Sequence, residues 1–595
     1  MKKLFLSFAA ILLALVILVP RFYHLGSQPP GLHIDEVSFA ADAKAIVETG
    51  RDTWNNRFPV VFKAFGEWKA PGLTYSMAFW TLLLGRMDTT VARLPSAVAG
   101  LVMLMSLYFT LIYLLGEKAK SVALFIVFVL AFSPWHFDMS RIFYEALSAG
   151  TIMALSLMVL VKVIMGKDKR ISSWVILAGL ASLAGYYYAS VRYGVIATIL
   201  LAALLEPIEL KKRLKLSVVV LATIFIVGIA WVPDLFSKRG LTRLYFYQEK
   251  SAISSSLNID QKRQFCYLSF AKDIRYAKIC YVFWNKPLFT LINTGKTYLS
   301  YLGPEFLFMS SGAEHGVDGY YGTYLLPLAP LYLLGFIELL IGMGRFVTSL
   351  FSKKIITSER DRAYFILGSA VIISLFPAAL SNSITPRMGV LFLYIVAIVI
   401  GLGASIAIEW IKSHMPRLAL PIYVAYSLVI IFFIIQSLLH YFAVFTRSND
   451  WAWTSDTSTV FSYVRSVSPK YERIIDTTLH GPLAPYFYGD LTTSEIQHGT
   501  HSEPDSAGWS FLAQAGKYEL IRRDIRDLAC EKWGTTDHRK TLVITQKADG
   551  LDGVTRFTAK TWNEMEVMHE VYDLDLVVAH ELDHNSSFKG TCTAK

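Results

Sequence analysis

The sequence has little charge and few cysteines. Only 17% of its 595 residues are charged and 54% are hydrophobic, with a mean hydropathy of +0.43, which excludes an ordinary soluble globular protein. The lysines and arginines lie between apolar runs and form no stripe with aromatic residues, so the net charge of +11 does not indicate a nucleic-acid partner. No internal repeat or low-complexity tract is evident. These absences leave a polytopic membrane protein.

The N-terminal apolar run lacks the small-x-small pattern of a cleaved signal peptide. It covers residues 4–20, follows Lys2-Lys3 and ends abruptly at Pro20-Arg21. We therefore predict a retained first span with a cytoplasmic N-terminus, because basic residues stay on the cytoplasmic side of a membrane.

About eleven apolar runs are long enough to be predicted as spans. They lie near 4–20, 91–115, 119–136, 142–165, 172–190, 193–207, 215–235, 323–344, 363–382, 388–411 and 418–442. The basic clusters near 118–120, 167–170, 211–215, 353–362 and 412–417 then fall on the side of Lys2-Lys3 at alternate connections. An odd number of spans places the C-terminal tail outside the cell, in a multi-pass protein of the plasma membrane.

The predicted domain organisation follows from this count. Residues 1–445 form an all-α polytopic membrane domain, with a first outer loop at 21–90 and a large outer loop at 236–322. Counting the apolar stretch 70–85 as a span would move three basic clusters outside, so we place it in the first outer loop as a juxtamembrane helix. From residue 446 the composition becomes polar with short β-prone runs, which predicts a soluble extracytoplasmic domain of mixed α/β structure over 446–595.

All four cysteines fall in segments predicted to lie outside. Cys266 and Cys280 belong to the large outer loop, and Cys530 and Cys592 belong to the C-terminal domain. An oxidising compartment favours two disulfides, Cys266–Cys280 and Cys530–Cys592. The alternative is four unpaired thiols that lie outside by chance.

Charged residues gather at the predicted outer ends of the spans. They are Asp35, Glu36, Lys69, Arg93, Asp138, Arg141, Glu145, Arg192 and Arg387, with Tyr187 close to Arg192. Charges beside membrane spans tend to mark function, and Asp138, Arg141 and Glu145 would share a face if their turn were helical. Structural alternatives exist for each: the arginines can reach lipid head groups, Glu145 can neutralise Arg141, and Asp35 can cap a helix that begins near Val37.

Several motifs in residues 1–440 resemble the C-type (GT-C) membrane glycosyltransferases, in the branch with the protein O-mannosyltransferases and the lipid A aminoarabinose transferases. The motifs are Leu32-His33-Ile34-Asp35-Glu36, Lys69-Ala70-Pro71-Gly72, Val91-Ala92-Arg93-Leu94-Pro95-Ser96-Ala97, Ser133-Pro134-Trp135-His136 and Arg141-Ile142-Phe143-Tyr144-Glu145-Ala146. Two looser ones are Pro304-Glu305-Phe306-Leu307-Phe308 and Pro377-Ala378-Ala379-Leu380.

The resemblance implies an inverting transfer of a sugar from a polyprenyl-phosphate donor to an acceptor hydroxyl on a protein, lipid or glycan, at the outer face. Asp35 would be the general base, with Glu36 helping to position the acceptor. Lys69, Arg93, Arg141 and Arg387 would hold the donor phosphate. Asp138, Glu145, Tyr187, Arg192 and His315 are further candidates. Cationic groups suit this reaction because the leaving phosphate gains negative charge.

The chain departs from the family pattern in two places. Ala70-Pro71 stands where members often have Pro-Pro, and Asp450-Trp451-Ala452-Trp453 does not supply the Trp-Trp-Asp motif of oligosaccharyltransferases. Transfer of a preassembled oligosaccharide to asparagine is therefore disfavoured. Some relatives use a divalent cation and others do not, and the spacing of the carboxylates leaves this open.

A zinc-protease pattern, His580-Glu581-Leu582-Asp583-His584, occurs near the C-terminus. Upstream residues 571–579 predict a strand, whereas that site needs a helix, so we interpret the pattern as a polar strand end. A secondary transporter or lipid-linked-sugar flippase is the main alternative function, although such proteins favour internal repeats and charges at mid-membrane. A catalytically inactive relative that binds glycan is a further alternative.

Overall fold

The computed structural model describes most of the chain. The described residues are 2–65, 67–168, 170–232, 257–269, 274–312, 319–351, 358–380, 384–448, 453, 455–478, 481–503, 510–548, 551, 553–560, 567–586 and 588–593. They divide into two compact units, one formed by residues 1–21 and 96–439 and the other by residues 22–95 and 440–595. The first outer loop predicted from the sequence thus clusters with the C-terminal region and not with the helical bundle.

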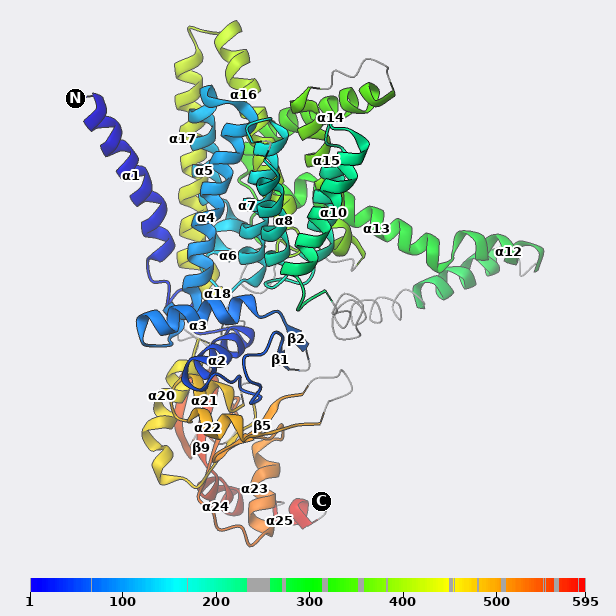
Figure 1. Cartoon of the computed structure of the whole chain (residues 1–595). Helices are drawn as coiled ribbons and strands as arrows, with labels where there is room; N and C mark the ends of the chain where they lie inside the picture. Colours follow the sequence, from blue (N-terminus) through cyan, green and yellow to red (C-terminus); the bar gives the residue numbers. More distant parts are fainter. Residues whose placement is uncertain are drawn as a thin grey trace. The chain divides into compact units, whose positions relative to one another are not determined.

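The first unit is helical (Figure 1). Its helices are α1 (Lys2–Phe22), α4 (Thr89–Leu115), α5 (Lys120–Ala131), α6 (Pro134–Met139), α7 (Glu145–Ile164), α8 (Ile171–Ala184), α9 (Val191–Leu204), α10 (Leu210–Val227), α12 (Ile274–Phe283), α13 (Lys286–Leu302), α14 (Ala329–Phe351), α15 (Glu359–Leu380), α16 (Val390–His414) and α17 (Ala419–Leu439). The first residues of α4, up to Pro95, and Phe22 of α1 belong to the second unit.

Six helices in the described part of the chain are long and apolar enough to cross a membrane. They are Thr89–Leu115, Glu145–Ile164, Leu326–Phe351, Glu359–Leu380, Val390–His414 and Ala419–Ser448. The chain is therefore an integral membrane protein. Each of the other five predicted spans coincides with a helix, namely α1, α5, α8, α9 or α10, but these do not meet the same criterion, so the count of eleven stays a prediction.

Helix α16 forms the centre of the bundle, and every residue from Val390 to Ala404 is buried. It packs against α14 through glycines: a Cβ atom on Gly335 would collide with the carbonyl oxygen of Val399, and one on Gly403 would collide with that of Leu331. Small residues at a helix interface let two backbones approach closely, which is how helices associate in a membrane without a hydrophobic driving force.

The second unit holds a mixed sheet and the helices around it. Its strands are β3 (Arg473–Asp476), β4 (Thr500–His501), β5 (Leu512–Ala515), β6 (Tyr518–Leu520), β7 (Thr541–Thr545), β8 (Thr555–Lys560) and β9 (Val567–Asp573). Their order is β4-β5-β6-β3-β7-β9-β8, and β3 runs parallel to both β6 and β7. The predicted mixed α/β region at the C-terminus is thus present.

Helices cover both faces of this sheet because its central strands are apolar on both sides. Ile474 of β3 faces a core with α20 (Thr457–Val467), α21 (Leu483–Phe487) and α22 (Thr493–Gln497). Its neighbour Ile475 faces the opposite core with α23 (Ile525–Gly534), α24 (Leu574–His584) and α25 (Phe588–Thr593). Successive side chains on a strand point to opposite faces, which explains the alternation.

The segment 22–95 of the same unit contains helix α2 (Ile34–Thr49), the hairpin strands β1 (Phe62–Ala64) and β2 (Glu67–Lys69), and helix α3 (Gly72–Leu84). Ala41 and Ala45 of α2 belong to the core on the Ile474 side of the sheet. The helix ends at Gly50, whose φ of 71° is the left-handed conformation that favours glycine. Helix α2 is therefore built into the folded core of the second unit.

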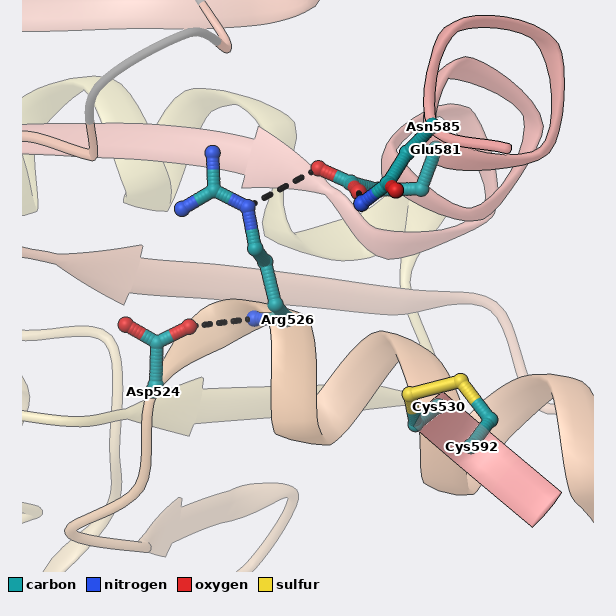
Figure 2. Close-up of a disulfide and its surroundings, with 6 residues drawn as sticks. All are labelled: Asp524, Arg526, Cys530, Glu581, Asn585 and Cys592. Atoms are coloured by element: carbon teal, nitrogen blue, oxygen red, sulfur yellow. Dashed lines mark hydrogen bonds and ion pairs between the residues drawn. A yellow bond between two sulfur atoms is a disulfide. The ribbon is translucent and has the colours of Figure 1, made fainter. Parts of the chain in front are cut away.

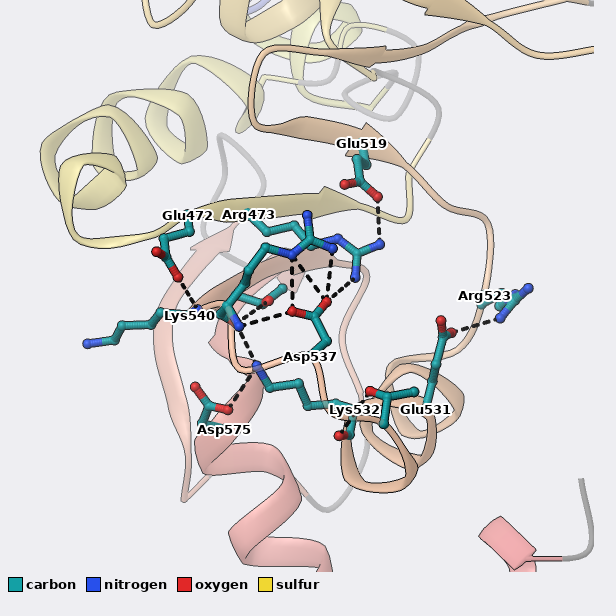
Figure 3. A network of polar contacts seen from close by, with 12 residues as sticks. Glu472, Arg473, Glu519, Arg523, Glu531, Lys532, Asp537, Lys540 and Asp575 are labelled. Carbon is teal, nitrogen blue, oxygen red and sulfur yellow. Dashed lines mark hydrogen bonds and ion pairs between the residues drawn. The ribbon is translucent and has the colours of Figure 1, made fainter.

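Two disulfides, both predicted, join Cys266 to Cys280 and Cys530 to Cys592. The second links α23 to α25 beside an ion pair between Arg526 and Glu581 (Figure 2). Arg473, at the start of β3, contacts Glu519 of β6 and Asp537 in the loop after α23, as Figure 3 shows. These links hold α23, α24 and the sheet together.

We expect the loss of Cys530–Cys592 to destabilise the protein more than the loss of Cys266–Cys280. The two bridges close loops with separations of 62 and 14 residues, and the chain-entropy model gives about 4 and about 3 kcal/mol for loops of these sizes. Thermal unfolding of Cys→Ser pairs at each bridge checks the order. Equal or reversed losses would contradict it.

Candidate functional site

The two predicted acidic residues lie in the first turn of α2. The preceding His33 caps the helix, and its Nδ1 accepts a hydrogen bond of 3.2 Å from the backbone N–H of Asp35. Asp35 is therefore not the cap of the helix, as one interpretation of the sequence allowed. Consecutive residues point about 100° apart around a helix. Accordingly the Asp35 side chain is 38% exposed, whereas that of Glu36 is fully buried.

Lys69, at the end of the β1–β2 hairpin, is the cation that Asp35 meets. Its Nζ lies 2.8 Å from Asp35 Oδ1, and the side chain is only 4% exposed. The same ammonium stands 4.4 Å from the ring centre of Phe39 and 5.5 Å from that of Phe65. These aromatic faces attract the cation and bury its stem. Lys69 therefore fixes the direction of the Asp35 carboxylate.

Arg93 binds Glu36 through two hydrogen bonds. Nε donates to Oε1 at 2.8 Å and Nη2 donates to Oε2 at 3.1 Å, and both side chains are fully buried. Burial raises the pKa of Glu36, and the adjacent guanidinium opposes that rise. Such a paired geometry is what makes a buried ion pair tolerable.

The remaining N–H groups of Arg93 donate to the carbonyl oxygens of Leu25, Pro29 and Gly31 at 3.0, 2.8 and 2.7 Å. A guanidinium has five N–H donors, and these five hydrogen bonds use them all. The geometry thus does not support the predicted role of Arg93 in holding a donor phosphate. It makes Arg93 a positioning residue that joins α2 to the preceding loop.

A second buried carboxylate supports α2 two turns further along. Asp42 Oδ1 accepts hydrogen bonds from the backbone N–H and hydroxyl of Thr53, at 3.0 and 2.6 Å. Burial raises the pKa of Asp42 to about 7 against these hydrogen bonds. Sequence reasoning missed this residue, since an aspartate inside an alanine-rich helix gives no sign of being buried.

The other predicted site residues belong to the first unit, the helical bundle. Asp138 lies in α6, Glu145 begins α7, and residues 140–144 between them are not helical, so these residues and Arg141 do not share one helix face as the spacing suggested. Tyr187 lies in the turn after α8, and Arg387 lies in the turn before α16. His315 lies outside the described residues.

Arg141 and Arg192 are buried in the bundle. Arg141 Nη1 donates to the carbonyl oxygens of Pro20 and Arg21, and Arg192 Nε donates to that of Gly185 at 2.9 Å. Arg21, which was not among the predicted site residues, is also fully buried and donates to the Ala131 carbonyl at 2.9 Å. An arginine at the end of an apolar run is a common topology signal, so the position of Arg21 did not indicate that its side chain would be buried.

The geometry thus brings together four of the predicted residues, as the two ion pairs Asp35–Lys69 and Glu36–Arg93. The indole of Trp453 adds to this group, with its ring centre 5.8 Å from the Arg93 guanidinium and 6.4 Å from the His33 ring. No local sequence signal links a tryptophan at 453 to a loop at 33. Only the fold makes this connection.

Two of the solved structures similar to this chain cover most of its length. One is ArnT from Cupriavidus metallidurans bound to undecaprenyl phosphate, with 12% identity, a TM-score of 0.48 and coverage of 96% of this chain and 98% of that chain. The other is the archaeal oligosaccharyltransferase AglB from Archaeoglobus fulgidus, in complex with an inhibitory peptide and a dolichol-phosphate. It has 12% identity and a TM-score of 0.46 over 79% of this chain and 58% of that chain. No family model and no curated protein matches the chain.

The zinc-protease pattern lies on a helix, so the prediction of a strand end was wrong. Strand β9 ends at Asp573, and α24 continues from Leu574 to His584. Glu581 is nevertheless bound by other residues: it accepts a hydrogen bond of 3.0 Å from Arg526 Nε and one of 2.7 Å from Asn585 (Figure 2). In the described part of the chain, no group of three or more His, Cys, Asp or Glu side chains is placed to hold a metal ion.

We expect Glu36→Gln to destabilise the protein by about 3–5 kcal/mol, because it leaves the Arg93 guanidinium buried without its anion. Removing both charges together, as in Glu36→Leu/Arg93→Met, should be less harmful than the single change. Thermal unfolding of the full chain in detergent measures both. As a control, Glu531→Gln breaks a pair with Arg523 whose side chains are 51% and 59% exposed, and it should cost under about 1 kcal/mol.

We also expect Asp42 to make the unfolding temperature depend on pH. The folded state keeps the Asp42 proton up to pH of about 7, whereas the unfolded state releases it near its ordinary pKa. Stability from this group is therefore present at pH 4 and declines as pH rises toward 7. Asp42→Asn should raise the unfolding temperature at pH 8 and change it little at pH 4. If the unfolding temperatures of the native protein and Asp42→Asn changed in parallel between pH 4 and pH 8, the raised pKa of Asp42 would be refuted.

Proposed function

We propose that the chain transfers a sugar from a polyprenyl-phosphate-linked donor to an acceptor hydroxyl at the outer face of the membrane. The observation that carries the proposal is the Asp35 carboxylate, which is 38% exposed in the first turn of α2 and directed by Lys69 at 2.8 Å. A general base must be accessible to the acceptor and held in one orientation. The resemblance of the surrounding motifs to the C-type glycosyltransferases supports the choice of donor.

In the proposed reaction the acceptor oxygen forms a bond to the anomeric carbon of the sugar, and its proton passes to Asp35. The bond between that carbon and the phosphate oxygen breaks, and the electron pair leaves on polyprenyl phosphate. A single displacement of this kind inverts the configuration at the anomeric carbon. Positive charge near the leaving oxygen stabilises the transition state more than the ground state.

The buried ion pairs suggest different roles for the basic residues. Lys69 orients Asp35 and adds a fixed positive charge beside it, while Arg93 and Glu36 hold the first turn of α2 in place. Arg93 is not assigned to the donor phosphate, because its five N–H donors are already occupied. For Arg141 and Arg387 of the helical unit, the resemblance to the C-type glycosyltransferases is what supports a role in holding that phosphate. Glu36 is fully buried and bound by Arg93, so its effect on the acceptor is through the position of Asp35.

The test uses the full chain in membranes with a radiolabelled polyprenyl-phosphate sugar and candidate acceptors. We expect the native protein to release polyprenyl phosphate only with acceptor present, and Asp35→Asn to be slower by at least about 10²-fold. Lys69→Met should also slow the reaction, and Lys69→Arg should recover part of the rate, because it keeps the charge beside Asp35.

The binding of donor is measured separately for each variant. Asp35→Asn that still binds donor but does not turn it over supports the assigned base. Equal turnover by the native protein and Asp35→Asn would contradict it. Movement of intact donor across the bilayer, with the sugar–phosphate bond uncleaved, would instead favour a flippase.

A further inference from the structure

A helical arm extends from the bundle in the first unit. It consists of the helical residues 257–269, helix α12 and helix α13. In Figure 1, α13 leads away from the other helices of the bundle toward α12. The disulfide Cys266–Cys280 joins the first segment to α12, and Arg263 Nε donates to the Trp284 carbonyl at 2.6 Å. The arm is therefore a cross-linked helical element.

Helix α13 attaches the arm to the bundle through one face. Thr297 and Tyr301 are buried there, and the hydroxyl of Tyr298 donates to the carbonyl of Ile372 in α15 at 2.8 Å. Ile292 and Leu299, seven residues apart, lie on the opposite side of the helix at 100° per residue. They are 46% and 71% exposed. Helix α13 thus has one face that packs against the bundle and an opposite face whose apolar side chains are exposed.

The rest of the arm exposes apolar side chains in the same way. Ile279, Val282 and Phe283 have the i, i+3, i+4 spacing of one helix face and are 44%, 63% and 63% exposed. Phe265, on the other side of the disulfide, is 58% exposed. Several large apolar side chains exposed along one helical element in this way mark an interaction site.

Positive charge accompanies this apolar surface. Residues 257–302 contain seven lysines and arginines against two aspartates. Lys262 Nζ stands 5.0 Å from the Trp284 ring centre, and the Arg263 guanidinium stands 4.5 Å from that of Tyr281. Aromatic faces attract these cationic groups, and basic residues combined with aromatic and apolar ones are typical of helices at a membrane interface.

The length and charge of the helices limit what can cover this surface. Helices α12 and α13 have 10 and 17 residues, fewer than the roughly 20 needed to cross the hydrocarbon core. Lysines at 278, 286 and 296 would be costly in that core. A protein partner would have to combine acidic charge with an apolar face on the same surface. The interfacial layer of a bilayer with anionic head groups matches both.

We propose that the arm lies in the head-group layer of the membrane and binds anionic phospholipid. Its apolar faces enter the boundary with the acyl chains, and its lysines pair with lipid phosphates. The disulfide holds the two helical segments in register for this contact. The inference is independent of the proposed transferase activity.

The first test places a photoreactive diazirine phenylalanine at position 283 in the full chain. The protein is reconstituted in nanodiscs of phosphatidylcholine with about one third phosphatidylglycerol, irradiated and analysed by mass spectrometry. We expect lipid adducts at position 283 and none at position 576, an exposed residue of α24 in the other unit. Adducts to a second protein molecule, or no lipid adduct at position 283, would overturn the proposal.

The second test removes charge while keeping the apolar face. Lys262→Gln/Lys278→Gln/Lys286→Gln should lower the lipid-adduct yield at position 283 several-fold in the phosphatidylglycerol discs, as should molar salt. The control Lys470→Gln/Lys560→Gln, at two exposed positions of the outer domain, should leave the yield unchanged. Equal yields from native and triple-variant proteins would refute the anionic-lipid assignment. Formation of Cys266–Cys280, checked by mass spectrometry, shows that the variant arm is folded.

Discussion

The buried pair Glu36–Arg93 is the constraint on which the candidate site depends. An arginine side chain keeps its positive charge in proteins. Burying it without an anion and hydrogen-bond acceptors would therefore be prohibitive. Arg93 finds both in Glu36 and in the carbonyl oxygens of Leu25, Pro29 and Gly31. This requirement fixes the loop before α2 and the first turn of the helix together. The direction of Asp35 follows, because it immediately precedes Glu36 in that turn.

A second constraint comes from the C-terminal region. Ala41 and Ala45 of α2 belong to the core of the second unit, where their small side chains allow close packing. Lys44 Nζ donates to the Tyr486 carbonyl at 2.9 Å, and Gln497 donates to the Thr49 hydroxyl at 2.7 Å. The helix that carries Asp35 is thus held by residues more than 400 positions away. Residues 440–595 therefore form part of the support of the site, in addition to any role in acceptor recognition.

Much of the local structure could be predicted from the sequence. The apolar runs coincide with helices because a backbone in lipid must satisfy its own hydrogen bonds, and the mixed α/β character of the C-terminal region followed from its short β-prone runs. The disulfide pairs were predicted correctly from position alone. The strand predicted over 571–579 was wrong because β9 passes directly into α24 at Asp573, whose side chain caps the new helix. An aspartate such as Asp573 is compatible with a strand end and with a helix cap, so the sequence does not separate the two.

The candidate site was likewise predictable in some respects and not in others. The residue types at 35, 36, 69 and 93 and their grouping were predictable, since charges beside apolar runs are costly and tend to converge. Which cation meets which carboxylate was not, because pairing depends on the approach of the β1–β2 hairpin and the start of α4 to α2. The sequence by itself determined the membrane character, the helical runs, the cysteine pairs and the set of ionic residues, all of which depend on composition and spacing. Only the tertiary structure decided that Arg93 is fully occupied by Glu36 and backbone carbonyls, and that α2 shares a folded unit with the C-terminal region. Hydrogen-bond saturation and core packing arise from segments far apart in the chain.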